Sequence, residues 1–211
     1  MKQIKDPLKE LDAIFWDFDG VLLASNEMRD QGFAEVLKAY PQEEVDKLMA
    51  FHQANGGLSR YVKFRYFFEE VRGEAITEKG VQQWAAKFSE IMMKLLKDPQ
   101  LQIQETLNFV KQHYHNIPMF VVSGSDQTEL YKLCKAHEIA MYFKRIHGSP
   151  KPKKQWVAEI LKEEQLNPAQ CILIGDSTND YDAAIENGIL FMGYNSGTAI
   201  ALSTAEMEFE V

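Results

Sequence analysis

Residues 13–20 read Ala-Ile-Phe-Trp-Asp-Phe-Asp-Gly, so an apolar run is followed directly by two acidic residues and a glycine. This pattern is typical of a buried strand that carries polar groups to the edge of a sheet. Asp17 and Asp19 cannot both stay ionised and close together in a core unless a cation compensates, because removing carboxylates from water raises their pKa. The segment therefore predicts a cation near the end of this strand. The alternative is a strand end capped by solvated aspartates.

The length of 211 residues suits one medium domain or a core domain with a smaller insertion. The formal net charge of -8 argues against a general binder of nucleic acid or of anionic membranes, because both need clustered Lys and Arg. No segment reaches the ~18 apolar residues of a membrane span, and residues 1–11 lack the apolar centre of a signal peptide. Cys134 and Cys171 lie in apolar-rich segments and fit reduced core residues better than a disulfide or a metal site, so we expect a cytoplasmic protein. We also expect a monomer or a weak homodimer.

The hydrophobic pattern changes twice along the chain. Between residues 26 and 96 apolar residues recur at helical spacing, in four groups separated by proline, glycine or polar breaks. From residue 101 onwards helical segments alternate with short apolar strands, which we expect at 117–122, 143–147, 171–174 and 189–193. This alternation predicts an α/β fold with a doubly wound, Rossmann-like parallel sheet, whose functional residues lie beyond the carboxyl ends of the strands. We expect a core of residues 1–25 and 98–211 and a helical insertion of residues 26–97.

Polar residues follow three of the expected strands. Asp17 and Asp19 end the first, Ser123 ends the second, and Asp176 and Asp180 follow the strand at 171–174. Three aspartates and a main-chain carbonyl make a hard oxygen site that suits Mg²⁺. A serine hydroxyl, the N–H groups at a helix start and a lysine can hold the other oxygens of a phosphate. Such a site is suited to phosphoryl transfer.

The segment after the second strand is expected to open a helix at residues 123–125, with Asp126 and Glu129 spaced as a capping box. Two of the polar residues also have a simpler interpretation. Ser123 could cap that helix, although the following Gly124 suits a loop that binds phosphate. Asp180 could cap or solvate a helix.

Four stretches resemble, in order, the motifs of the haloacid dehalogenase (HAD) superfamily, in the branch of phosphoglycolate phosphatase and β-phosphoglucomutase. They are Asp17-Phe18-Asp19-Gly20, Val121-Val122-Ser123-Gly124, Lys151-Pro152 and Ile174-Gly175-Asp176-Ser177-Thr178-Asn179-Asp180. The resemblance implies that Asp17 attacks phosphorus to form an aspartyl phosphate. It also implies that Asp19 protonates the leaving oxygen and then activates water.

The same resemblance implies the ligands. Mg²⁺ would be held by Asp17, the main-chain carbonyl of Asp19 and Asp176, with Asp180 bound directly or through water. Ser123, Gly124 and Lys151 would bind the phosphoryl group. We choose Lys151 because the Lys-Pro pair and its distance from Asp176 look like the family arrangement. Lys153 is the alternative, and both lysines could belong to a solvated basic face.

The helical insertion resembles the C1 cap of the family, which closes over the core and selects the leaving group. Its most polar break contains His52, Asn55, Gly56, Gly57 and Arg60. Two glycines between helices let backbone approach a ligand closely, and Arg60 could meet an anionic or hydroxyl-rich leaving group. The alternative is an ordinary loop between helices with solvated cations.

The function that we expect is a Mg²⁺-dependent phosphatase that hydrolyses a small phosphorylated metabolite, such as a sugar phosphate or a hydroxy-acid phosphate. Ala24-Ser25 stands where many relatives have Asp-Ser, which weakens the implication of a phosphoglycolate-type substrate. A phosphomutase of the β-phosphoglucomutase type is the alternative, and a noncatalytic phospho-acceptor module is a more distant one. A phosphonatase would carry a Schiff-base lysine in its cap, which leaves Lys63 open for that role.

Overall fold

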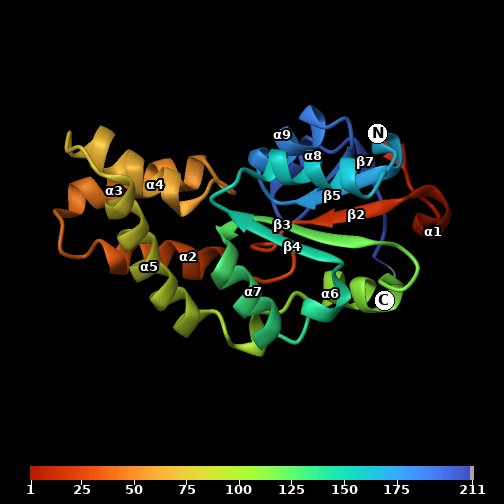
Figure 1. The fold of residues 1–211 in the computed structure, drawn as a ribbon, viewed down its shortest axis with the longest axis horizontal. Coiled ribbons are helices and arrows are strands. Elements are labelled where there is room, and N and C mark those ends of the chain that lie inside the picture. Colours follow the sequence, from red (N-terminus) through yellow and green to blue (C-terminus); the bar gives the residue numbers. More distant parts are fainter. Residues whose placement is uncertain (210–211) are drawn as a thin grey trace.

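The structure, a computed structural model, describes residues 1–209 and is built on a five-stranded parallel sheet (Figure 1). The strand order is β4-β3-β2-β5-β6. The strands are β2 (Ala13–Trp16), β3 (Met119–Asp126), β4 (Arg145–Ser149), β5 (Cys171–Gly175) and β6 (Leu190–Gly193). The first strand of the sequence motif is thus central, with β3 and β5 as its parallel neighbours.

Helices cover both faces of this sheet. Figure 1 shows α8 (Lys153–Glu163) and α9 (Thr178–Glu186) on one side, and α6 (Gln104–His113) and α7 (Gln127–Ala136) on the other. Side chains of β2 alternate between the two layers: Phe15 packs in the cluster that includes α8 and α9, whereas Trp16 packs in the cluster that includes α6 and α7. A strand buried on both faces is uniformly apolar, as residues 13–16 are. The predicted doubly wound α/β fold is confirmed.

The segment between β2 and α6 is helical. It contains α2 (Asn26–Val36), α3 (Gln42–Ala54), α4 (Arg60–Tyr66) with a π-helical turn at Phe67–Val71, and α5 (Glu78–Leu95). These helices gather beyond the arrowheads of the strands, at the carboxyl ends of the sheet (Figure 1). Aromatic rings hold them together, including Phe33 and Phe88 with ring centroids 4.3 Å apart. We call residues 26–95 the helical insertion.

Short elements complete the fold. Strand β1 (Lys2–Gln3) pairs with β7 (Ala205–Glu206), and α1 (Pro7–Glu10) and α10 (Gly197–Ala201) lie near the chain ends. Short 3₁₀ turns occupy Pro99–Leu101, Ala140–Tyr142 and Pro168–Gln170. Among the helices of residues 1–209, none combines the length and apolar character that crossing a bilayer requires.

Two expected boundaries are wrong. The strand expected at 143–147 runs from Arg145 to Ser149, because a 3₁₀ turn at Ala140–Tyr142 occupies the preceding residues. The helix expected to open at residues 123–125 begins only at Gln127, because β3 continues to Asp126 past a shift in register. Asp126 does cap α7, accepting from the N–H groups of Thr128 and Glu129 at 3.0 Å. The Glu129 side chain does not complete the capping box.

Candidate active site

Three buried or half-buried carboxylates and one ammonium meet at the carboxyl end of the sheet. Asp17 directly follows β2, Asp176 directly follows β5, and Asp180 lies in the first turn of α9. One oxygen of each aspartate lies within 4.8 Å of the others. Lys153, the first residue of α8, places Nζ 2.9 Å from Asp17 Oδ1 and forms a second ion pair with Asp180. The expected convergence of the three aspartates is therefore present.

The electrostatics of this cluster disfavour three ionised carboxylates without a further positive charge. Burial, and then the charge of Asp180, raises the pKa of Asp17 well above its ordinary value, and Lys153 only partly opposes this. The same two causes raise the pKa of Asp176 to about 6. Burial tends to lower the pKa of Lys153, but Asp17 and Asp180 outweigh it and raise the pKa, so this lysine stays charged. One ammonium among three carboxylates leaves the cluster short of cations.

The donor set fits a hard divalent cation. Apart from its ion pair with Lys153, Asp17 Oδ1 has no hydrogen-bond partner within residues 1–209, although it is buried. Gly20 has φ of +76°, and a Cβ there would lie 2.0 Å from Asp176 Oδ2, so glycine lets this carboxylate approach the β2 loop. Asn26 donates to the same Asp176 oxygen at 2.7 Å. Carboxylate oxygens in this number and closeness suit Mg²⁺.

The choice of Lys151 as the lysine of the site is wrong, and the alternative, Lys153, is the lysine that lies there. Its ammonium lies 3.8 Å from the ring centroid of Trp156 and pairs with Glu159, on the outer side of α8. Lys153 is 4% exposed and reaches the aspartates. The two lysines lie in different places because Pro152 is the N-cap of α8. Lys151 therefore precedes the helix, whereas Lys153 projects from its first turn.

Asp180 has protein partners at both oxygens. Its Oδ1 is paired with Lys153, and its Oδ2 accepts from the Ser177 N–H at 3.1 Å and from the Ser177 hydroxyl at 2.6 Å. Ser177 and Asp180 form the capping box of α9. The helix-capping interpretation of Asp180 is therefore correct, and the same side chain also lies in the aspartate cluster.

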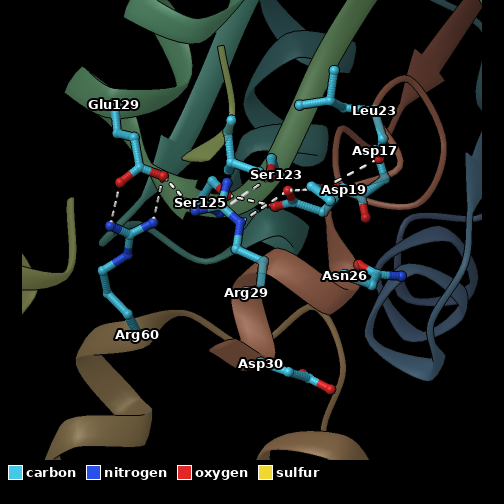
Figure 2. A network of polar contacts seen from close by, with 12 residues as sticks. Asp17, Asp19, Leu23, Asn26, Arg29, Asp30, Arg60, Ser123, Ser125 and Glu129 are labelled. Atoms are coloured by element: carbon cyan, nitrogen blue, oxygen red, sulfur yellow. Dashed lines mark hydrogen bonds and ion pairs between the residues drawn. The ribbon is translucent and has the colours of Figure 1, made fainter. Parts of the chain in front are cut away.

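Asp19 is turned away from Asp17 towards the helical insertion (Figure 2). Its Oδ1 accepts from the Ser25 hydroxyl and from Arg29 Nε, the latter at 3.0 Å, and its Oδ2 accepts from the Ser125 hydroxyl at 2.6 Å. Burial tends to raise the pKa of Asp19, but the charge of Arg29 and the serine hydrogen bonds outweigh it and lower the pKa. Asp19 is therefore held as an ionised carboxylate.

Ser123 and Gly124 lie at the end of β3 beside this cluster. The Ser123 hydroxyl accepts from the Ser125 N–H at 3.1 Å and is buried. Because α7 starts at Gln127 under the Asp126 cap, Ser123 does not cap a helix. A Cβ on Gly124 would lie 2.1 Å from the carbonyl oxygen of Gly57, so only glycine permits this contact with the helical insertion.

The break between α3 and α4 rests directly on the core. Gly57 has φ of +78°, and a Cβ there would lie 2.5 Å from Ser177 Oγ. Gly56, its neighbour, and His52 line the same cavity as Asp17 and Asp19, whereas Asn55 donates to the Phe51 carbonyl at the end of α3. The cavity between the insertion and the core has a volume of about 400 Å³. The insertion thus covers the site.

Arg60 is held by the core. Both of its Nη atoms donate to Glu129, and Nη1 also donates to Ser89 at 2.7 Å. Arg29 joins the same glutamate from α2 and donates to Ser125 at 2.8 Å (Figure 2). Burial tends to raise the pKa of Glu129, but the two arginines outweigh it and lower the pKa to about 2.

The sequence analysis missed most of this network. No local pattern in the sequence separates these residues from surface residues: Ser25, Arg29, Ser125 and, for its side chain, Glu129. Asn26 is likewise only the first residue of a helix in the sequence. Their partners lie up to 150 positions away along the chain, as Asp176 does from Asn26, so the fold is needed to bring them together.

Comparison with solved structures finds the same fold in several enzymes. β-Phosphoglucomutase from Clostridium difficile superposes with a TM-score of 0.72 at 14% identity, covering 94% of this chain and 92% of that one. CbbY from Rhodobacter sphaeroides in complex with phosphate gives 0.69 at 18% identity, covering 94% and 95%. A predicted phosphoglycolate phosphatase from Haemophilus somnus gives 0.68 at 18% identity, covering 95% and 96%. Identities this low show a shared fold.

Family membership comes from the sequence itself. Comparison with curated protein sequences finds no match. The family model for haloacid dehalogenase-like hydrolases matches residues 14–194, which include the aspartate cluster, Lys153 and the whole helical insertion. The chain therefore belongs to the haloacid dehalogenase-like hydrolase family, as its four motifs predict.

Proposed function

We propose that the protein is a Mg²⁺-dependent phosphatase that hydrolyses a small phosphomonoester, such as a sugar phosphate or a similar metabolite, through an aspartyl phosphate on Asp17. The observation that carries this proposal is the meeting of Asp17, Asp176 and Asp180 within 4.8 Å, with Lys153 as the ion-pair partner of Asp17 and Asp180. Mg²⁺ held by Asp17, Asp176 and the Asp19 carbonyl would neutralise the carboxylates and the phosphoryl oxygens.

The side chains divide the reaction between them. Asp17 attacks phosphorus, its carboxylate oxygen forms the new P–O bond, and the leaving oxygen departs with a proton from Asp19. In the second half, Asp19 takes a proton from the attacking water, and the aspartyl phosphate is hydrolysed. The first step needs Asp19 protonated and the second needs it ionised, and the proton taken from water in the second step is the one that Asp19 gives to the leaving oxygen of the next turnover. The lowered pKa of Asp19 supports the ionised form, which is the form that accepts this proton. Ser123 and the Gly124 N–H would hold the transferring phosphoryl group.

In this proposal Lys153 is the lysine that binds the phosphoryl group, the role that we first expected of Lys151. Its ammonium is held between Asp17 and Asp180, so its side chain is already in the conformation that places the charge beside the nucleophile. A fixed cation at the place where charge develops lowers the barrier to phosphoryl transfer. In this proposal Asp180 orients Lys153 and reaches Mg²⁺ through water.

The partner in this proposal is a small phosphorylated metabolite, since the site lies in a covered cavity of about 400 Å³. The net charge of -8 does not favour nucleic acid or an anionic membrane as a partner. Cys134 and Cys171 are both buried free thiols, a state that supports a reducing compartment such as the cytoplasm. We propose a monomer or weak homodimer.

The test is phosphate release from an aryl phosphate and from a panel of sugar and hydroxy-acid phosphates, with and without Mg²⁺. Asp17→Asn should abolish turnover, whereas Asp182→Asn, an exposed aspartate on α9, should retain it. Turnover that survives Asp17→Asn would contradict the nucleophile assignment.

A phosphomutase of the β-phosphoglucomutase type is the second candidate, since a structure with that name has this fold. Phosphorus NMR of a sugar 1-phosphate separates the two, because a mutase moves the phosphate to another hydroxyl and releases none. A stable phosphoprotein without turnover would instead indicate the noncatalytic phospho-acceptor module.

A further inference from the structure

A lysine in the wall of the cavity has spare hydrogen-bond donors. Lys63, on α4, is 3% exposed and lines the cavity that contains Asp17 and Asp19. Its ammonium contacts His52 Nδ1 at 2.6 Å, and within residues 1–209 it forms no salt bridge with a carboxylate. An ammonium carries three N–H donors, so two remain for a ligand. A buried charge without a direct counter-ion is unfavourable unless something else compensates it.

His52 and Asp30 fix this ammonium in place. His52 Nε2 lies 2.8 Å from Asp30 Oδ1, and burial, followed by the charge of Lys63, lowers the pKa of His52 to about 4. The imidazole is therefore neutral at pH 7, donating from Nε2 to Asp30 and accepting at Nδ1 from Lys63. Burial lowers the pKa of Lys63 to about 8, so the lysine is still largely an ammonium at pH 7.

The other cations on this side of the cavity are already compensated. Arg29 is paired with Asp19 and Glu129, and Arg60 is paired with Glu129 through both Nη atoms. Two guanidinium groups thus face two carboxylates. The described lysine and arginine side chains that line the cavity are Arg29, Arg60 and Lys63, and of these three Lys63 alone has no salt bridge with a carboxylate.

We propose that Lys63 binds a carboxylate on the leaving group, so that the substrate is a phosphorylated hydroxy acid, with His52 as the residue that positions Lys63. This inference rests on the proposed phosphatase function and adds the class of its substrate. A carboxylate carries one negative charge and can accept from both spare N–H groups of the ammonium. A second phosphate would bring about two negative charges, which one ammonium balances only in part, and the neighbouring Arg29 and Arg60 are already paired with carboxylates.

The test uses 3-phosphoglycerate and glycerol 3-phosphate, which differ in a carboxylate in place of a hydroxymethyl group. We expect wild-type kcat/KM to favour 3-phosphoglycerate, and we expect Lys63→Met to reduce that preference by about 10- to 100-fold, mostly through KM. Lys47→Met, an exposed lysine on α3, should leave the preference unchanged. His52→Phe should reduce the preference in the same direction as Lys63→Met.

Binding separates this inference from the phosphatase proposal. Titration of Asp17→Asn protein with the two compounds should give a lower Kd for 3-phosphoglycerate, and adding Lys63→Met or Lys63→Gln should remove the difference. Absence of turnover with this binding pattern intact would overturn the phosphatase alone. Turnover with equal use of both compounds, or a preference for glycerol 1,3-bisphosphate, would overturn the assignment of Lys63.

Discussion

Glu129 of the core accepts hydrogen bonds from Arg60 of the helical insertion at both carboxylate oxygens, one of them at 2.8 Å from Nη2. The two residues are 69 positions apart, and both are nearly fully buried. Arg29 binds the same glutamate and also Asp19, so Glu129 is connected to two helices of the insertion and, through Arg29, to Asp19. The contact therefore holds the insertion over the cavity and, through Arg29, also helps to fix the position of Asp19.

The first prediction concerns the stability that this contact provides. Glu129→Gln leaves two buried guanidinium groups without their shared anion, which should lower the free energy of unfolding by about 3 kcal/mol. Urea denaturation followed by far-UV circular dichroism measures the change. Glu90→Gln, at an exposed position of α5, serves as the control and should alter stability by less than about 0.5 kcal/mol. Equal stability of the Glu129→Gln and wild-type proteins would contradict a role for the contact.

The same contact predicts a pH dependence. The pKa of Glu129 falls from an ordinary value of 4.5 to about 2 in the folded protein. A depressed carboxyl pKa stabilises the fold fully above the unfolded value, and this stabilisation is lost as the pH falls through the folded value. The difference in unfolding free energy between wild type and Glu129→Gln should thus be constant above about pH 5 and shrink from pH 4.5 towards pH 2. A difference that grows on acidification would refute this account.

A third prediction separates the two neighbouring lysines. Lys153→Met removes the ammonium between Asp17 and Asp180, and we expect kcat to fall by about 100-fold or more. Lys151→Met removes an ammonium that lies over Trp156, outside the aspartate cluster, and should change kcat less than about threefold. Steady-state kinetics with one aryl phosphate compares the two variants. The reverse order would restore Lys151 as the lysine of the site.

The choice between these lysines shows where a single sequence stops being sufficient. The strands that end just before Asp17 and just before Asp176 are visible as apolar runs, and a parallel sheet brings such ends to one edge. Which of two lysines two residues apart enters the site depends on where α8 begins, and helix boundaries are the least certain feature of a sequence. Glu129 is harder still, because its arginines come from distant helices.

A fourth prediction concerns the glycines between α3 and α4. Gly57→Ala places a Cβ near Ser177 Oγ at a φ of +78°, so the insertion should no longer rest on the core, and kcat/KM should fall by about 10- to 100-fold. Gly73→Ala is a matched control, because Gly73 has φ of +66° but nothing within 4 Å of the added Cβ. Both variants should lose about 1 kcal/mol of stability from backbone strain. Equal activity in the two would mean that the contact of Gly57 with the core does not matter for turnover.

The last prediction follows from the titration of Lys63. Burial lowers its pKa to about 8, and its charge responds to Asp19, Arg29, Asp30 and Arg60 around it, with neutral His52 in contact. A lysine binds an anion only as an ammonium, so the preference in kcat/KM for 3-phosphoglycerate over glycerol 3-phosphate should be greatest below about pH 8 and decline above it. The carboxylate stays ionised throughout this range, and using a ratio cancels any ionisation that affects both substrates alike. In Lys63→Met the ratio should be small and independent of pH between 6 and about 9. A decline of the same size in that variant would assign the titration to another group.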